Sequence, residues 1–300
     1  MQSSKLYRTI IIIGSLFFSA DTMAQQLFKL SQYVEHSFLH NPAAVGANGS
    51  GTVGGAYRSQ WSGIEGGPTT AVLFADKYFS SKKAGVGIVL YTDKTGPTSR
   101  TGGELNISYS VKLGGDKRLM IGIGGQVIQF KVDKNKIAAS IPNDPLLASN
   151  GSAIKGDAQA GIYYRSNTFN LGVSAKQLIQ PKLNFIKTSA NPNGRLYRQY
   201  FGAASYYIKT DEDNILVPHV EVRYQPEAPL DYEGGIILYH RDILHFGLSA
   251  HLKQSYTGFL GVKIMHRLSI SYAYDFYNKP VSGFESGYGA HEVMLRYFFK

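Results

Sequence analysis

The chain of 300 residues contains no cysteine. Disulfide-stapled scaffolds, thiol catalysts and thiolate zinc sites all require cysteine, so these three classes are excluded. Charge is also scarce, because Asp, Glu, Lys and Arg make up only 17% of the sequence, against about 25% in typical soluble domains. A soluble chain of this length normally needs more charge to cover its surface. The composition is therefore unusual for a soluble protein.

Apolar residues are plentiful by comparison. Hydrophobic residues account for 43% of the chain and aromatic residues for 13%, with 21 tyrosines and 33 glycines but one tryptophan. This content is ample for a buried core and argues against intrinsic disorder. The length allows either one large β domain or two domains of ordinary size.

Residues 1–24 have the pattern of a secretory signal peptide. Lys5 and Arg8 provide the positive start, an apolar run extends from Ile10 to Phe18, and small residues precede Gln25. This order predicts cleavage after Ala24 and export of the mature chain. The run is shorter than the roughly 20 residues that a transmembrane helix needs. An uncleaved membrane anchor is the alternative interpretation.

The mature chain has the periodicity of β-strands throughout. Leu268, Ile270 and Tyr272, for example, are separated by serines, so one face of the strand is apolar and the other polar. Segments of about ten residues are long enough to cross a bilayer when tilted. The candidate strands are 51–60, 69–77, 84–92, 103–113, 118–130, 156–165, 168–178, 198–209, 215–225, 231–240, 243–253, 256–264, 267–277 and 288–299.

These strands predict an all-β fold, an antiparallel transmembrane β-barrel of about 14 strands. A soluble β-sandwich also alternates, but its strands average about 5–6 residues. The polar faces also hold ionisable groups such as Glu104, Glu221 and Arg223, which suit the inside of a membrane barrel. Twelve strands, or a soluble secreted β-protein, are the alternatives.

The connections between these strands alternate in length. Outer-membrane barrels have short periplasmic turns and longer extracellular loops, so this alternation fits such a barrel. In that arrangement both chain ends lie in the periplasm. Residues 93–102 are expected to form one of the long loops, whereas the tight turn at Gln254-Ser255 breaks the pattern. The predicted organisation is a signal peptide at 1–24, an N-terminal periplasmic segment or plug at 25–50, and the barrel at 51–300. The outer membrane is the expected location.

The sequence offers little that suggests catalysis. It has no phosphate loop, no helical HExxH and no nucleophile elbow. His245 and His251 share a strand face but lie roughly 20 Å apart, too far to bind one metal ion. The glycine-rich run that begins at Gly122 is interpreted as room beneath a crowded lumen or as a bend of the wall. We therefore expect no enzyme activity, no cofactor and no metal.

The net charge of +10 does not indicate nucleic-acid binding. The basic residues are dispersed rather than clustered with aromatic residues. Lys131, Lys134 and Lys136 form a local cluster in an expected outer loop. They could contact acidic lipopolysaccharide or an acidic partner, although an ordinary solvated loop explains them equally well.

Eight short motifs, none of them specific alone, occur in a characteristic order between about Gln32 and Phe299. In that order and spacing, the chain strongly resembles the PorP/SprF family of membrane proteins of type IX secretion and gliding motility. One departure is Ala290, where the family pattern usually has serine. The motifs are Asn41-Pro42-Ala43, Tyr57-Arg58-Ser59-Gln60-Trp61, Gly66-Gly67-Pro68-Thr69-Thr70, Gly85-Val86-Gly87-Ile88, Tyr91-Thr92-Asp93-Lys94-Thr95-Gly96-Pro97, Lys176-Gln177-Leu178-Ile179-Gln180-Pro181, Ser271-Tyr272-Ala273-Tyr274-Asp275 and Gly289-Ala290-His291-Glu292.

The resemblance implies an outer-membrane barrel that serves protein secretion rather than catalysis. Members of the family associate with the type IX apparatus, contact periplasmic components linked to the cell wall peptidoglycan, or pair with a large secreted adhesin. In the last case, the barrel supports export or surface anchoring of the adhesin through its C-terminal domain. The sequence does not distinguish these roles. An outer-membrane diffusion channel or hydrophobic-solute transporter is the alternative function.

The motif residues also have local interpretations. Asn41-Pro42 suits a chain that turns into the barrel as a lid or plug, or simply a turn. Trp61 suits either an interfacial aromatic belt or the mouth of the lumen. His291 and Glu292 point to opposite faces, and Glu292 is expected to form a lumenal ion pair with Arg296. For nearly all of these residues, the alternative to partner binding is that they only help to build the barrel. The candidate residues are Asn41, Pro42, Tyr57, Arg58, Gln60, Trp61, Pro68, Asp93, Gly96, Pro97, His291, Glu292 and Arg296.

Overall fold

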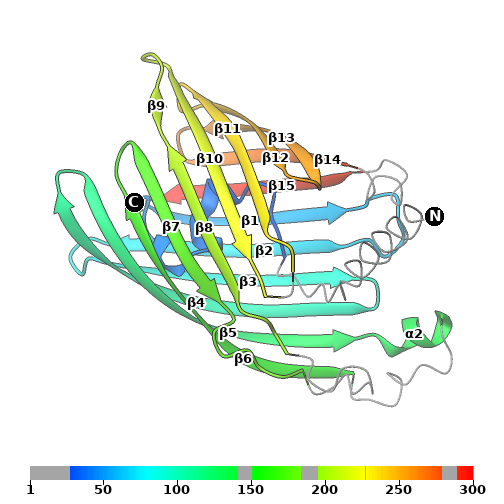
Figure 1. The fold of residues 1–300 in the computed structure, drawn as a ribbon. Coiled ribbons are helices and arrows are strands. Elements are labelled where there is room, and N and C mark those ends of the chain that lie inside the picture. Colours follow the sequence, from blue (N-terminus) through cyan, green and yellow to red (C-terminus); the bar gives the residue numbers. More distant parts are fainter. Residues whose placement is uncertain (1–27, 141–150, 184–194, 227, 279–288, 300) are drawn as a thin grey trace, which may run out of the picture.

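A computed structural model describes residues 28–140, 151–183, 195–226, 228–278 and 289–299. The predicted signal peptide, 1–24, lies outside the described residues. Every strand pairs antiparallel with its neighbours, β1 with β15 and β10 with β11, so the sheet closes on itself. The result is the barrel of Figure 1. Strands β8 and β9 are one strand interrupted at Tyr207, which gives fourteen strands among the described residues.

The observed elements follow the predicted segments closely. They are η1 (Tyr33–Leu39), η2 (Pro42–Ala44), β1 (Gly51–Gln60), β2 (Thr69–Phe79), β3 (Ala84–Thr95), β4 (Thr98–Gly114), β5 (Lys117–Val132), α2 (Lys134–Ser140), β6 (Ser152–Arg165), β7 (Phe169–Lys176), β8 (Gln199–Tyr206), β9 (Ile208–Lys209), β10 (Asn214–Tyr224), β11 (Asp231–His240), β12 (Leu244–His251), β13 (Ser255–Ile264), β14 (Leu268–Tyr277) and β15 (Ala290–Phe299).

One predicted loop is wrong. Residues 93–102 do not form a long loop, because β3 and β4 continue through them and join at the turn Gly96-Pro97. Asp93 pairs with Arg100 and Thr95 with Thr98. The alternation of apolar and polar residues fades here although the strands continue. Since both faces of a strand can contact water beyond the bilayer, periodicity gives no signal there.

The two ends of the barrel differ. The tight turns β2–β3, β4–β5, β6–β7, β9–β10, β11–β12 and β13–β14 lie at one end, called here the short-turn end and seen at the left of Figure 1. The opposite end, the long-loop end, has the connections 61–68, 133–151, 177–198, 225–230 and 278–289, together with two tighter ones at 96–97 and 252–254. β1 begins at the short-turn end, where residue 50 enters it.

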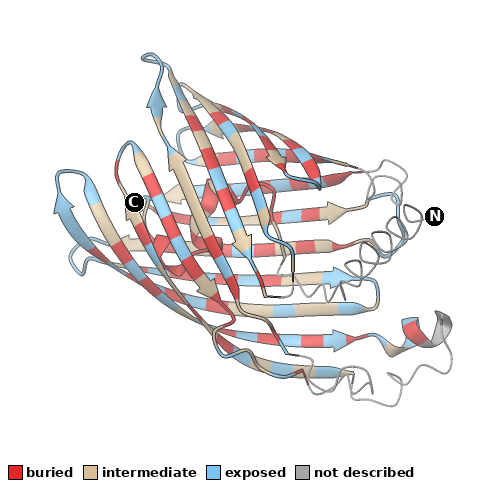
Figure 2. Ribbon diagram, in the orientation of Figure 1, coloured by how far each residue is buried: buried red, intermediate tan, exposed pale blue. Residues whose placement is uncertain are grey.

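Burial alternates along the strands, as Figure 2 shows by its banded colours. The outer face is apolar: Leu73, Ile123 and Leu248, for example, are more than 60% exposed. Polar side chains such as Asn106, Gln159 and Glu292 point inward and are buried. This arrangement is that of a membrane barrel, with lipid outside and a polar lumen within. No helix among the described residues is long and apolar enough to cross a membrane.

Candidate functional site

Residues 28–50, called here the lumen segment, run through the inside of the barrel. Phe28 lies near the long-loop end, where its ring centroid is 4.8 Å from that of Tyr91. Val45 reaches the other half of the barrel, where its carbonyl accepts a hydrogen bond of 2.7 Å from Ser108. Ser50 then leads into β1 at the short-turn end. The described part of the segment therefore spans most of the length of the lumen.

Asn41 attaches the lumen segment to the barrel wall. Its Oδ1 accepts a hydrogen bond of 2.9 Å from the N–H of Ala43, which caps η2, and Pro42 occupies the first turn. Its Nδ2 donates to the carbonyls of Ile162, at 3.0 Å, and Val173, at 3.3 Å. One side chain thus holds a short helix and two neighbouring wall strands, β6 and β7.

Glycines in the wall make room for this attachment. A Cβ on Gly122 of β5 would overlap the backbone of Pro42 and Ala43, and a Cβ on Gly161 would overlap the side chain of Asn41. Gly85 lies in the same way against the carbonyl of Val45. The interpretation of the Gly122 run as room in a crowded lumen is therefore confirmed.

Arg58 lies at the centre of a buried charge cluster near the long-loop end. Its guanidinium forms ion pairs with Asp275 and, at 3.4 Å, with Glu292. It also donates a hydrogen bond to the hydroxyl of Ser31, whose own N–H donates to Glu292 at 2.6 Å. The lumen segment is therefore fixed at this end by groups from β1, β14 and β15.

The predicted ion pair between Glu292 and Arg296 is wrong. Both side chains face the lumen, but Arg296 pairs with Glu35 of the lumen segment and also donates to the Glu35 carbonyl at 2.8 Å. Tyr239 donates a further hydrogen bond to the Glu35 carboxylate. The reason is that the segment supplies a carboxylate closer to Arg296 than its own strand does.

Three more contacts between basic and acidic side chains hold the lumen segment. They join Lys29 to Glu233 at 2.6 Å, His36 to Asp76 at 3.5 Å and His40 to Glu221 at 2.9 Å. Their wall partners lie on β2, β10 and β11. Pairs of basic and acidic side chains therefore surround the segment on several sides rather than along one seam.

The remaining candidate residues are spread over the molecule. Tyr57 faces outward and is 55% exposed, and His291 also faces outward, where its Nδ1 lies 2.7 Å from the hydroxyl of Tyr272. Gln60 faces inward and donates to the Tyr277 hydroxyl at 3.0 Å. Trp61 follows β1 at the long-loop end with a positive φ of 51°.

Pro68, Asp93, Gly96 and Pro97 belong to the long-loop end. The Pro68 carbonyl accepts a hydrogen bond from Gln60, and Asp93 accepts one of 2.7 Å from Thr70. Gly96 donates to the carbonyl of residue 66, and the Pro97 carbonyl accepts from residue 133. The sequence motifs thus divide between this rim, the lumen contacts and the outer wall.

Sequence reasoning did not single out Glu35, His36 or Ser31, although each contacts the wall. Their signal is weak because they lie in a short stretch without strand periodicity. Their partners Asp76 and Asp275 lie on the lumen faces of their strands. A carboxylate at such a position was the sequence signal that could have indicated a polar partner inside the barrel.

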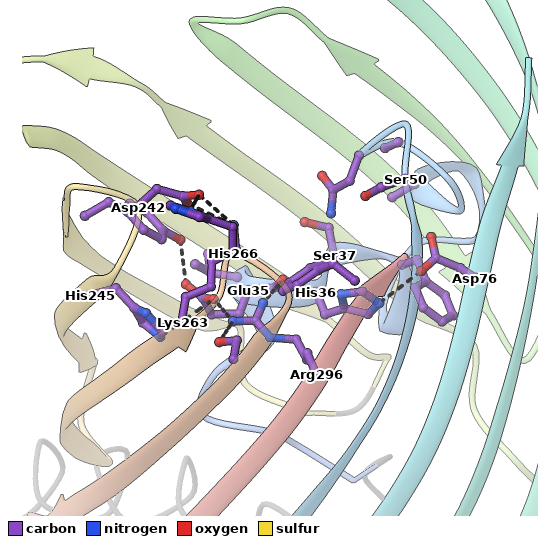
Figure 3. Close-up of a pocket in the computed structure, with 18 of the residues that line it drawn as sticks. Glu35, His36, Ser37, Ser50, Asp76, Asp242, His245, Lys263, His266 and Arg296 are labelled. Carbon is purple, nitrogen blue, oxygen red and sulfur yellow. Dashed lines mark hydrogen bonds and ion pairs between the residues drawn. The ribbon is translucent and has the colours of Figure 1, made fainter. Parts of the chain in front are cut away.

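A cavity of about 830 Å³ remains beside the lumen segment, toward the short-turn end (Figure 3). Its lining includes Glu35 and His36 from the segment, and Arg296, His245 and Lys263 from the wall. Figure 3 shows Lys263 and His266 beside Asp242 on one side and His36 beside Asp76 on the other. The described residues contain no group of His, Asp and Glu side chains arranged to hold a metal ion.

A closed antiparallel barrel with an apolar outer wall and a polar lumen defines the class of outer-membrane barrel proteins. Within that class, residues 22–297 match the family of the type IX secretion system membrane protein PorP/SprF. The match covers nearly the whole chain, so the protein belongs to this family, as the order of its motifs predicted. No curated protein matches the chain.

Solved structures share the fold but little sequence. The toluene transporter TbuX of Ralstonia pickettii has a TM-score of 0.54 at 9% identity, covering 88% of this chain and 93% of that one. The outer membrane protein Omp33 of Acinetobacter baumannii has a TM-score of 0.47 at 8% identity, covering 84% of this chain and 97% of that one. At such low identity, the likeness to TbuX supports the outer-membrane barrel fold alone.

Proposed function

We propose that this protein is a non-enzymatic outer-membrane component of type IX secretion that binds another protein. The partner is a secreted adhesin, held through its C-terminal domain, or a periplasmic component linked to the cell wall. Binding of either partner would support export or surface anchoring, including the anchoring of adhesins used in gliding. The protein reaches the membrane by means of the signal peptide predicted at 1–24.

The lumen segment is the observation that carries the proposal. A protein that conducts solutes needs an open path. In this protein residues 28–50 occupy the lumen, and buried polar contacts hold them to the wall. Glu35 with Arg296, and Ser31 with Arg58 and Glu292, join the segment to the wall at two depths. With the lumen occupied, the two rims are the surfaces that remain accessible to a partner protein.

The orientation follows from the loops. Outer-membrane barrels have short periplasmic turns and longer extracellular loops. We therefore place the short-turn end in the periplasm and the long-loop end at the cell surface. A secreted adhesin would meet the long-loop end, and a cell-wall-linked component would meet the short-turn end.

Crosslinking in intact cells tests the proposal. The tagged protein is crosslinked, purified from outer membranes in detergent, and its partners are identified by mass spectrometry. We expect a type IX component or an adhesin to be recovered with it. An unrelated outer-membrane barrel carrying the same tag is the control. Recovery of the same proteins with both barrels would contradict the proposal.

Solute transport is the second candidate, and the 830 Å³ cavity is the observation that favours it. A cavity of this size can hold a small molecule. Planar-bilayer conductance of the purified protein separates the two functions. Steady conductance of the wild-type barrel would support transport, and its absence would support the binding function.

A further inference from the structure

Three cations lie side by side at the short-turn end of the barrel, on β4, β5 and β6. Lys112 is the direct cross-strand partner of Arg118, and Arg118 is the direct partner of Arg165. Directly opposite residues share a face, with Cβ atoms about 4.5–5.5 Å apart. We call Lys112, Arg118 and Arg165 the basic row.

The basic row belongs to the lumen side of the wall rather than the lipid side. Successive residues of a strand point to opposite faces, so residues two apart share a face. Each member of the row is two residues from a buried residue that faces the lumen. These buried neighbours are Ser110, Met120 and Tyr163, respectively.

The row lacks matching negative charge. Arg118 stacks over the Tyr78 ring at 5.4 Å, and Arg165 donates to the Ala47 carbonyl and to Asn48. Among the described residues, Lys112 has no ion pair. Like charges directly opposite each other on a sheet are destabilising. An uncompensated row on three adjacent strands therefore lowers stability, and such a cost is typical of a surface kept for binding.

One carboxylate, Asp116, lies in the turn between β4 and β5, but among the described residues no ion pair joins it to a member of the row. Asp116 accepts a hydrogen bond of 2.6 Å from the N–H of Asn167. This hydrogen bond, with one from its own backbone, lowers the pKa of Asp116. Lys82 and Lys83 in the adjacent β2–β3 turn add further positive charge to the same rim.

The basic row adjoins the cavity described above. Arg165 is part of the lining of that cavity, and exposed Arg267 lies on its rim. Two buried histidines of the lining have ring nitrogens without a hydrogen-bond partner, both nitrogens of His36 and Nε2 of His245. The site therefore offers cations at its mouth and histidine rings within, although His36 also lies 3.5 Å from Asp76 and His245 lies 4.0 Å from Glu35.

We propose that the basic row and the adjoining cavity bind an acidic segment of a polypeptide partner in the periplasm. The lumen-facing side of the row disfavours membrane phospholipid as the occupant, because lipid headgroups surround the outer wall. The basic row crosses three adjacent strands and is roughly 10 Å long. This length fits a peptide with several carboxylates better than one small anion. This inference rests on the proposed partner-binding function for its biological role and on the proposed orientation for its compartment.

Purified protein in detergent provides the test, which depends on neither the orientation nor the type IX role. A fluorescent oligoglutamate peptide is titrated by anisotropy against the wild type and against the variant Lys112→Gln/Arg118→Gln. We expect the variant to bind about tenfold more weakly, a loss of about 1.4 kcal/mol, because two cations of the row are removed. The control, Lys94→Gln/Lys155→Gln, removes two charges at the long-loop end and should bind as the wild type does.

Several outcomes would overturn the inference. They are no saturable binding by the wild type, equal losses in both double variants, or equally tight binding of an acidic polysaccharide such as polygalacturonate. If crosslinking in cells recovers no partner but the purified protein binds the peptide, the proposed partner-binding function fails. The proposed binding site at the basic row then still stands.

Stability gives a second, independent measurement. Removing like charges from adjacent strands should raise the thermal midpoint of Lys112→Gln/Arg118→Gln above that of the wild type. Weaker binding together with higher stability is the expected combination. Should the double variant fail to fold, the single variant Lys112→Gln, at an exposed position, gives the same readout. Unchanged peptide affinity in Lys112→Gln would then contradict the inference.

Discussion

At the scale of the single residue, Gly122 decides how closely the lumen segment approaches the wall. Gly122→Ala would place a methyl group into the backbone of Pro42 and Ala43. Overpacking of this kind typically costs about 1–3 kcal/mol. We expect Gly122→Ala to lower the free energy of unfolding by that amount, measured by denaturant titration with heat-modifiable gel mobility as readout.

Gly125 supplies the matched control on the same strand. A Cβ at Gly125 meets no atom within 4 Å, so Gly125→Ala should leave the unfolding free energy almost unchanged. If both alanine variants unfold alike, the lumen segment does not press against β5 as described.

Glu35 and Arg296 give a second prediction at this scale. Glu35→Gln leaves the buried Arg296 without its carboxylate, which typically costs about 3–5 kcal/mol. The double variant Glu35→Gln/Arg296→Met removes both charges and should be more stable than Glu35→Gln alone. Denaturant titration of the three proteins checks the order. A double variant less stable than Glu35→Gln alone would show that the pair is not the dominant interaction.

At the scale of the element, the lumen segment has a direction. Its described start, Phe28, lies at the long-loop end, and Ser50 lies at the short-turn end. The absence of native cysteine allows each end to be labelled without background. In intact cells, we expect a membrane-impermeant maleimide to label Phe28→Cys, and to label Ser50→Cys only after the outer membrane is opened.

This labelling also bears on the sequence prediction of a periplasmic segment at 25–50. Labelling of Ser50→Cys in intact cells, without labelling of Phe28→Cys, would mean that the barrel has the opposite orientation. A Phe28→Cys variant that reacts in neither state would mean that the segment is shielded at the surface by loops or by a partner.

Strand periodicity predicted β1 and β11 to the residue, because both lie within the region where one face is apolar and the other polar. It missed the outer parts of β3 and β4, where both faces meet water. It also missed the lumen segment's contacts with the wall. Glu35 has no periodic neighbours, and its pairing with Arg296 depends on a chain path through the barrel that no local pattern encodes.

At the scale of the whole molecule, the most deeply buried part of the lumen wall is acidic without its segment. The buried wall residues include fewer permanent cations, Arg58, Lys176 and Arg296, than carboxylates. The buried wall carboxylates are Asp76, Glu104, Asp157, Glu221, Glu233, Asp275 and Glu292. Rings of acidic side chains favour the passage of cations.

Deleting residues 28–47 should therefore open a cation-selective pore. We expect the wild-type protein to show no steady conductance in planar bilayers and the deletion variant to conduct, with a reversal potential in a KCl gradient that indicates K⁺ selectivity. Conductance by the wild type, or anion selectivity of the deletion variant, would contradict this account of the lumen.

The sequence by itself determined the architecture and the family. Alternation over ten-residue segments requires a sheet with one apolar face, and strands of that length in a charge-poor chain fit a barrel in the outer membrane. The order of eight motifs identified the family. Only the tertiary structure decided that residues 28–50 fill the lumen, that Glu35 rather than Glu292 pairs with Arg296, and that Lys112, Arg118 and Arg165 form one row. The physical reason is that periodicity depends on neighbours along the chain, whereas ion pairs and cross-strand rows depend on register and chain path, which closure of the barrel sets.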